Sequence, residues 1–157
     1  MKATFKIEGM DKLKKDLERL GKVPQKHVTQ SAKKGMNIVL KDAKANAQID
    51  DGDLKRGIVL NGEKSKHKGK KVYQVVFDDK MNDVFQKPIQ NPVNAKRNIA
   101  YYPASQEYGY FLRDGTYMPG LYFMHNALNN NAPRVAKTII NHMQGKIDAE
   151  IRKVGLK

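Results

Sequence analysis

The spacing of apolar residues along the chain predicts both strands and helices. Residues 2–8 alternate apolar with polar side chains, which is the period-two pattern of a half-buried strand. Apolar residues then recur every three or four positions over residues 11–20 and 24–47, so we expect two helices there. The same stripe returns over residues 118–155 and predicts a third helix, bent or divided at Pro133 because proline lacks the backbone N–H.

The segments between these helices carry strand and loop signals. Residues 57–60, 71–77 and 99–102 are rich in β-branched and aromatic side chains, as strands are. Residues 80–98 combine prolines and side-chain amides with few apolar positions, so we interpret them as an extended loop or an insertion. The resulting order predicts an α+β fold, with an antiparallel sheet of about four strands packed against long helices and a long C-terminal helix. We expect residues 1–157 to form a single domain.

Composition excludes several classes of chemistry. The chain has no cysteine, which removes disulfides, thiolate metal sites and a cysteine nucleophile. Its apolar runs are only a few residues long, far below the roughly 20 that a membrane helix needs, so we expect no contact with a membrane. Because the first ten residues lack the apolar core of a secretory signal, we also expect synthesis in the cytoplasm.

The strong positive charge points to an anionic neighbour. The chain has 30 Lys and Arg residues against 16 Asp and Glu residues, a formal net charge of +14, and 24 of the 30 are lysines. A lysine attracts phosphate as a point charge and lacks the planar fork that reads a base edge, so nonspecific attraction is expected. The densest cluster is predicted to contact DNA or an acidic partner, unless it is a solvated hairpin tip: Lys64, Lys66, Lys68, Lys70 and Lys71.

Catalytic signals are few, and we expect no cofactor and no metal. No histidines have the spacing of a helical zinc site, and the sequence contains no glycine-rich phosphate loop. Asp78 and Lys80 have the D-x-K spacing, at the end of an apolar strand, that magnesium-dependent nucleases use. The alternative interpretation of this short pattern is a solvated turn.

Aromatic residues are concentrated in one part of the chain. Eight of the twelve lie between Tyr101 and Phe123, a stretch in which Arg113 is the one basic residue. Tyrosine is enriched where proteins meet, although the same residues could instead cover the core beneath a loop. The residues predicted to form contacts between subunits are Tyr102, Tyr108, Tyr110, Phe111, Tyr122 and Phe123.

Four short motifs, in this order, resemble one protein family. They are FKIEGMDKL at residues 5–13, ANAQIDDGDLKRGI at 45–58, AYYP through EYG at 100–109, and MPGLYFMHNAL at 118–128. The chain is similar to the tail-completion or head–tail joining proteins of long-tailed bacteriophages, described as minor tail protein Z-like. It departs from them at Gln48, where proline is common, at Asp51, where threonine is usual, and in the 80–98 segment.

This resemblance implies a structural virion protein and not an enzyme. It would complete the tail or join tail to head as a multimeric ring around the DNA path, at the neck or tail end of the virion, with a hexamer favoured. Its neighbours would be head-connector and tail-tube or tail-terminator proteins, with nonspecific contact to packaged DNA. The alternatives are a nonspecific nucleic-acid-binding protein and, less favoured, a magnesium-dependent nuclease.

Overall fold

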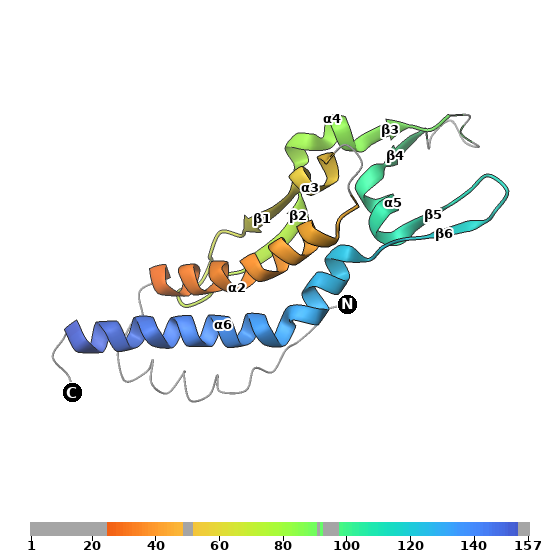
Figure 1. Ribbon diagram of the computed structural model, residues 1–157. Helices are drawn as coiled ribbons and strands as arrows, with labels where there is room; N and C mark the ends of the chain where they lie inside the picture. The colour runs from red at the N-terminus through yellow and green to blue at the C-terminus, as the bar shows by residue number, and fades with distance from the viewer. Residues whose placement is uncertain (1–24, 49–51, 91, 93–97, 154–157) are drawn as a thin grey trace. The chain divides into compact units, whose positions relative to one another are not determined.

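The computed structural model of the chain describes residues 25–48, 52–90, 92 and 98–153 (Figure 1). The strand expected at residues 2–8 and the helix expected at 11–20 lie outside the described residues. Within the described part, no helix combines the length and the apolar character that crossing a bilayer requires.

Two long helices occur where the apolar stripes predict them. Helix α2 spans Gln25–Asn46 and helix α6 spans Phe123–Lys153. Helix α6 begins later than expected and is continuous through Pro133, which therefore does not divide it. The shorter elements are α3 (Asp53–Gly57), β1 (Ile58–Gly62), β2 (Tyr73–Phe77), η1 (Asp79–Met81), α4 (Asn82–Phe85), β3 (Gln86–Pro88), β4 (Ile99–Tyr101), α5 (Tyr102–Tyr108), β5 (Gly109–Phe111) and β6 (Tyr117–Pro119).

The α+β class and the long C-terminal helix are confirmed, but the described strands do not form one sheet. They form three two-stranded pairs, β1 with β2, β3 with β4, and β5 with β6. The last two pairs are antiparallel. Each described strand pairs with one neighbour along the chain, so the described strands form no continuous sheet of four.

The first half of the predicted 80–98 loop contains regular structure. Helix α4 and strand β3 lie there, and Phe85 at the end of α4 is fully buried. Phe85 is the one aromatic residue of this predicted loop, and its burial anchors a segment in which polar residues and proline predominate. Residues 91 and 93–97 lie outside the described part of the chain.

The structure divides into two compact units. Unit 1 comprises Met1–Ile38, Gly62–Gln74 and Asn131–Lys157, and unit 2 comprises Val39–Asn61 and Val75–Asn130. Both long helices and the β1–β2 pair pass from one unit to the other, so the single domain expected over residues 1–157 stays a prediction.

In unit 1 the first part of α2 packs against the second part of α6, and the two run antiparallel (Figure 1). Val28 on α2 packs against a core formed by Met143 and Ile147 of α6. Closer to the centre of α2, Gly35 is buried, and a Cβ there would lie 2.5 Å from the Cγ1 of Ile139. The lack of a side chain at Gly35 therefore lets the two helices approach closely at this point.

Polar contacts also join these two helices. The buried Ser31 hydroxyl shares a 2.9 Å hydrogen bond with Nδ1 of His142. Farther along, Nε2 of His27 lies 3.2 Å from the carboxylate of Glu150. Because both contacts have partners at fixed positions on the facing helix, they specify the register in which α2 and α6 pair.

Aromatic rings form the centre of unit 2. Phe77 from β2 makes edge-to-face contacts with Phe85, Tyr101 and Phe123, at centroid separations of 5.9, 6.4 and 6.3 Å. Phe85 also meets Tyr101 at 5.9 Å. These four rings bring together β2, α4, β4 and the start of α6, so aromatic packing holds the short elements of this unit in place.

Candidate interaction surfaces

Strands β5 and β6 form a hairpin whose two faces both carry apolar side chains. Phe111 lies opposite Tyr117 on one face, with ring centroids 5.1 Å apart, and Tyr110 lies opposite Met118 on the other. Alternate residues of a strand point to opposite faces, so neither face of this hairpin is polar. We call residues 108–122 the aromatic hairpin.

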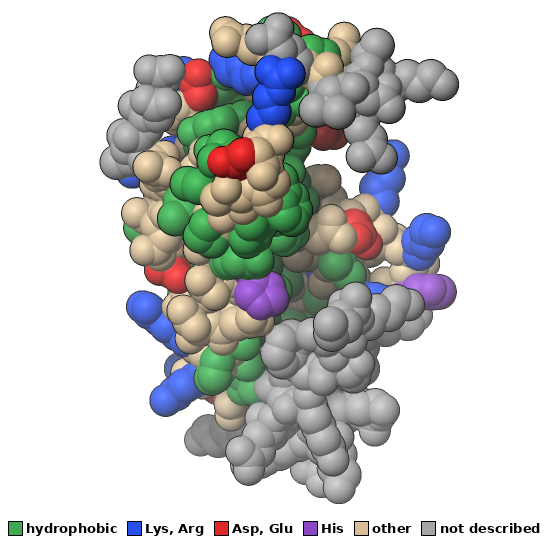
Figure 2. Space-filling view, turned by 90° about the vertical axis from the view of Figure 1, so that its right-hand side faces the viewer, with side chains coloured by type: hydrophobic (Ala, Val, Ile, Leu, Met, Phe, Trp, Pro, Cys, Tyr) green, Lys and Arg blue, Asp and Glu red, His purple; other side chains and the backbone are tan. Residues whose placement is uncertain are grey.

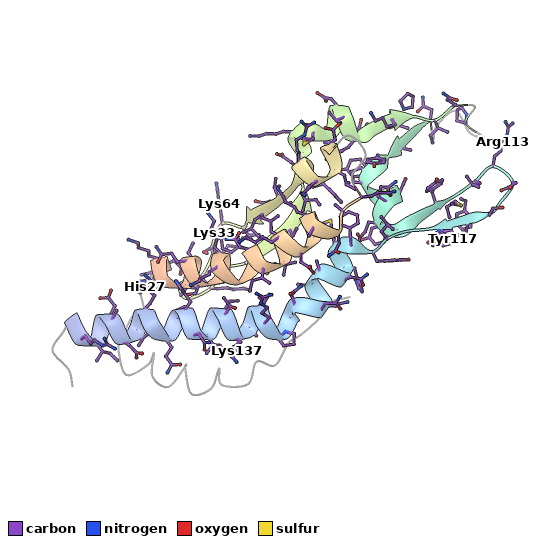
Figure 3. All side chains as sticks on the ribbon, viewed as in Figure 1. His27, Lys33, Lys64, Arg113, Tyr117 and Lys137 are labelled. Atoms are coloured by element: carbon purple, nitrogen blue, oxygen red, sulfur yellow. The ribbon has the colours of Figure 1, made fainter. Side chains whose placement is uncertain are left out.

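The turn of the aromatic hairpin is built by local hydrogen bonds. The Leu112 N–H donates to the Thr116 carbonyl at 2.8 Å, and Gly115 adopts a φ of 86° that suits glycine. The Thr116 N–H donates to the Asp114 carboxylate at 2.9 Å, and this bond lowers the pKa of Asp114. Arg113, labelled in Figure 3, and Asp114 are the two charged residues within residues 108–122.

The aromatic hairpin exposes an unusual amount of apolar surface. Phe111 is 73% exposed and Tyr108 is 62% exposed. Figure 2, which looks at the side toward which the hairpin extends in Figure 1, shows hydrophobic side chains gathered together there. The exposed large apolar residues of this segment are Tyr108, Tyr110, Phe111, Leu112, Tyr117, Met118, Leu121 and Tyr122. Contiguous apolar surface of this kind is typical of sites of protein contact.

A buried carboxylate anchors the base of the hairpin. Glu107, 3% exposed, accepts hydrogen bonds from the backbone N–H groups of Met124 and His125, each at 3.0 Å. These donors belong to the first turn of α6, which has no partners for them within the helix, and the partial positive charge of a helix N-terminus favours an anion there. Glu107 therefore ties the end of α5 to the start of α6.

Two glycines let the strands approach at the same point. A Cβ on Gly120 would lie 2.3 Å from the Glu107 carbonyl and 2.4 Å from the nitrogen of Gly109. Gly109 has a φ of 85°, and a Cβ there would lie 2.2 Å from the carbonyl oxygen of Met118. The EYG and MPG motifs, eleven residues apart in the sequence, thus form one interlocked structure that fixes the direction of the hairpin.

The six residues predicted to make subunit contacts differ in exposure: four are exposed, one is buried and one is partly exposed. Tyr108, Tyr110, Phe111 and Tyr122 are exposed on the aromatic hairpin. Phe123, the first residue of α6, is 2% exposed. It belongs to the core, where its ring contacts Phe77. Tyr102 at the start of α5 is only partly exposed.

Sequence reasoning missed four residues of this surface: Leu112, Tyr117, Met118 and Leu121. Leu112 directly follows β5, and the other three lie in β6 or just after it; no strand was expected at either place. The Asp114-Gly115 dipeptide between two short apolar runs is a hairpin signal that would have placed them.

The predicted lysine cluster lies on the loop that joins β1 to β2. Gln25, the first residue of α2, holds this loop at two consecutive residues, accepting from the Gly69 N–H at 2.8 Å and donating to the Lys70 carbonyl at 3.1 Å. The Ser65 hydroxyl also donates to the Lys70 carbonyl, at 2.7 Å. Lys64, labelled in Figure 3, lies on this loop.

Four of the five predicted lysines are exposed on this loop, and the fifth differs. Lys64, Lys66, Lys68 and Lys70 are exposed. Lys71 is only partly exposed: its Nζ donates to the Glu63 carbonyl and lies 5.2 Å from the centroid of the Tyr73 ring. Lys71 therefore links the two ends of the β1–β2 loop, through its bond to Glu63 and its cation–π contact with Tyr73, in addition to any contact with a partner.

Charge is divided unequally between the two units. Over the described residues, unit 1 carries thirteen Lys and Arg residues against three Asp and Glu residues, whereas unit 2 carries seven of each. The neutral unit holds the aromatic hairpin and the strongly cationic unit holds the lysine loop. The two predicted contact surfaces are thus electrostatically distinct.

The Asp78-x-Lys80 pattern forms a local cap. The Asp78 carboxylate accepts the backbone N–H of Lys80 at 3.0 Å, at the start of η1. In the described part of the chain, no group of three or more His, Cys, Asp or Glu side chains is arranged to hold a metal ion.

The comparison with protein families gives one match. The family described as "Bacteriophage HK97-gp10, putative tail-component" matches residues 11–115, about two thirds of the chain. The matched region includes the lysine loop and ends in the turn of the aromatic hairpin. Neither the curated proteins nor the solved structures give a match.

Proposed function

This chain belongs to the HK97-gp10-like family of bacteriophage tail components, and from that premise we propose that it completes the tail or joins tail to head as a multimeric ring around the DNA path. The ring, favoured as a hexamer, sits at the neck or tail end of the virion. Its neighbours there are a head-connector protein and a tail-tube or tail-terminator protein.

The aromatic hairpin is the observation that carries this proposal. A two-stranded hairpin is marginally stable alone, and it normally needs a partner to cover an apolar face. Here Phe111 with Tyr117 and Tyr110 with Met118 leave both faces apolar. A ring repeats one head-to-tail interface between unlike surfaces, so a projecting element that inserts into the next subunit suits it.

Sedimentation velocity and native mass spectrometry of the full chain test this role. We expect a multimer larger than a dimer, and we expect the double variant Tyr110→Ser/Phe111→Ser to shift it to monomer. The matched control is Ile89→Ser/Ile99→Ser, which removes two exposed large apolar side chains from the β3–β4 pair and its flank. The ring is contradicted if the wild-type chain is a monomer in solution and also binds assembled tails as a single copy.

The proposed role is non-enzymatic. Since the Asp78 carboxylate already caps η1, its substitution is expected to alter local stability and not a reaction. Incubation of the full chain with DNA and Mg²⁺ or Mn²⁺ tests this directly. Cleavage that Asp78→Ala abolishes would establish the nuclease alternative.

A nonspecific nucleic-acid-binding protein is the second candidate, favoured by the excess of positive charge in unit 1. This alternative requires duplex binding by the free chain, outside any particle. If about six phosphates are contacted, affinity falls by ~10³ or more between 50 and 200 mM salt. Binding of that strength by a chain that never assembles would favour this candidate over the ring.

A further inference from the structure

A shallow recess of about 550 Å³ opens along the α2–α6 pair in unit 1. Lys34 contributes to it from α2, and Thr138, Asn141, His142 and Lys146 contribute from α6. No acidic side chain lines this recess, although Asp148 and Glu150 lie on the same helix. The recess was not among the surfaces expected from the sequence, since its cationic residues come from segments more than a hundred positions apart.

These side chains suit an anion that has several acceptor oxygens. Two lysines supply positive charge and donors, while the Asn141 amide and the Thr138 hydroxyl supply neutral donors. The free oxygens of a phosphate group accept charge-assisted hydrogen bonds, and lysine binds phosphate as a point charge without strict geometry. A planar carboxylate, by contrast, is best matched by the arginine fork, which is absent from the lining residues.

The positive field in the recess acts on one of its own residues. Burial lowers the pKa of His142, and Lys34, Lys146 and His27 lower it further because their charges disfavour a protonated imidazole. Ser31 fixes the ring through its 2.9 Å hydrogen bond with Nδ1. An anion bound at the recess would offset these cations, so His142 is a natural reporter of its presence.

Gly145 keeps the recess open. A glycine in the interior of a helix is unfavourable by about 0.5–1 kcal/mol relative to alanine. Packing explains Gly35, where a Cβ would collide with Ile139, but a Cβ on Gly145 would have no heavy atom within 4 Å. Gly145 lines the recess, so the absence of a side chain there leaves space for a ligand.

We propose that the α2–α6 recess binds a phosphate group through Lys34, Lys146 and the donors between them, and that in the particle this phosphate belongs to a nucleic-acid backbone. The choice of nucleic acid rests on the proposed function, which places the chain around the DNA path. It is also favoured by the lysine-dominated charge of unit 1, which suits a closely spaced row of phosphates better than scattered carboxylates.

The phosphate site is tested by NMR titration of the four histidines in the full chain. Inorganic phosphate, compared with sodium chloride at equal ionic strength, is expected to raise the pKa of His142 more than those of His67 and His125. The variant Lys34→Gln/Lys146→Gln is expected to abolish this difference. An absent response of His142, or an equal response of His142, His67 and His125, overturns the recess as a site.

Duplex DNA tests the source of the phosphate. Lys34→Gln/Lys146→Gln is expected to weaken binding about tenfold and to reduce the salt slope by roughly one to two. The matched control is Lys33→Gln/Lys137→Gln, which removes the same charge from the same two helices at exposed positions that do not line the recess (Figure 3). The control is expected to lose clearly less affinity, and equal losses would show that bulk charge alone attracts DNA.

Two further outcomes identify other ligands. A His142 response to inorganic phosphate with no difference between the two DNA variants would assign the recess to free phosphate and overturn the nucleic-acid assignment. A response to polyglutamate as large as that to DNA would indicate an acidic protein and overturn the phosphate assignment. None of these results depends on multimer formation, so failure of the recess is distinguishable from failure of the ring.

Discussion

The carboxylate of Glu107 accepts a hydrogen bond from the backbone N–H of His125 at 3.0 Å, across eighteen residues of sequence. Its other oxygen accepts from the Met124 N–H, so one buried side chain satisfies two donors of the first turn of α6. The aromatic hairpin is the segment enclosed between these partners. The orientation of the aromatic hairpin therefore depends on the polar contact between Glu107 and the start of α6.

Replacing Glu107 tests this anchor. Glu107→Ala leaves two backbone donors without a partner, and it is expected to lower the free energy of unfolding by about 2–3 kcal/mol. Glu107→Gln keeps one acceptor oxygen and is expected to cost about half as much. Chemical denaturation measures both changes, and equal stability of Glu107→Ala and wild type would contradict the anchor.

The hairpin glycines allow a comparison between lack of space and backbone strain. Gly120 has no positive φ, but a Cβ there would collide with the backbone of Glu107 and Gly109, whereas Gly115 has a φ of 86° and open space around it. Gly115→Ala is expected to cost about 1 kcal/mol, the penalty of a left-handed conformation. Gly120→Ala is expected to cost clearly more, because two backbone segments must separate. Thermal unfolding distinguishes the two, and the reverse order would contradict the packing at the base of the hairpin.

The two mid-helix glycines of unit 1 should respond in opposite directions to the same substitution. Gly145→Ala removes a conformational cost without any collision, so it is expected to stabilise the chain by about 0.5–1 kcal/mol. Gly35→Ala places a methyl group against Ile139 and is expected to destabilise it by about 1–3 kcal/mol. Urea unfolding of the two variants provides the measurement, and stabilisation by both would show that the helices do not pack closely at Gly35.

His142 makes stability depend on pH. Its folded-state pKa is lowered from the usual 6.5, first by burial and then by Lys34, Lys146 and His27, so the unfolded chain binds the proton more readily. Stability is therefore complete well above pH 6.5, falls as the pH drops through that value, and levels off below the folded pKa. His142→Gln is expected to flatten this part of the stability profile while keeping a polar group near Ser31. An unchanged slope in the variant would assign the pH dependence to other groups.

The sequence predicted the elements that depend on local pattern. The stripe over residues 24–47 gave α2, and the β-branched and aromatic segments gave β1, β2 and β4, because hydrophobic periodicity and side-chain shape act within a single element. The excess of lysine and the concentration of aromatic residues were likewise visible without a structure. The family resemblance stated from four motifs agrees with the family match over residues 11–115.

Only the tertiary structure decided which side of each pattern faces solvent and which residues meet. Phe111 and Phe123 are similar in the sequence, yet the first projects from a hairpin and the second is buried against Phe77. The cationic recess joins Lys34 to Lys146, and the hairpin anchor joins Glu107 to His125. Such contacts arise from the packing of elements that are distant along the chain, and no local periodicity encodes them.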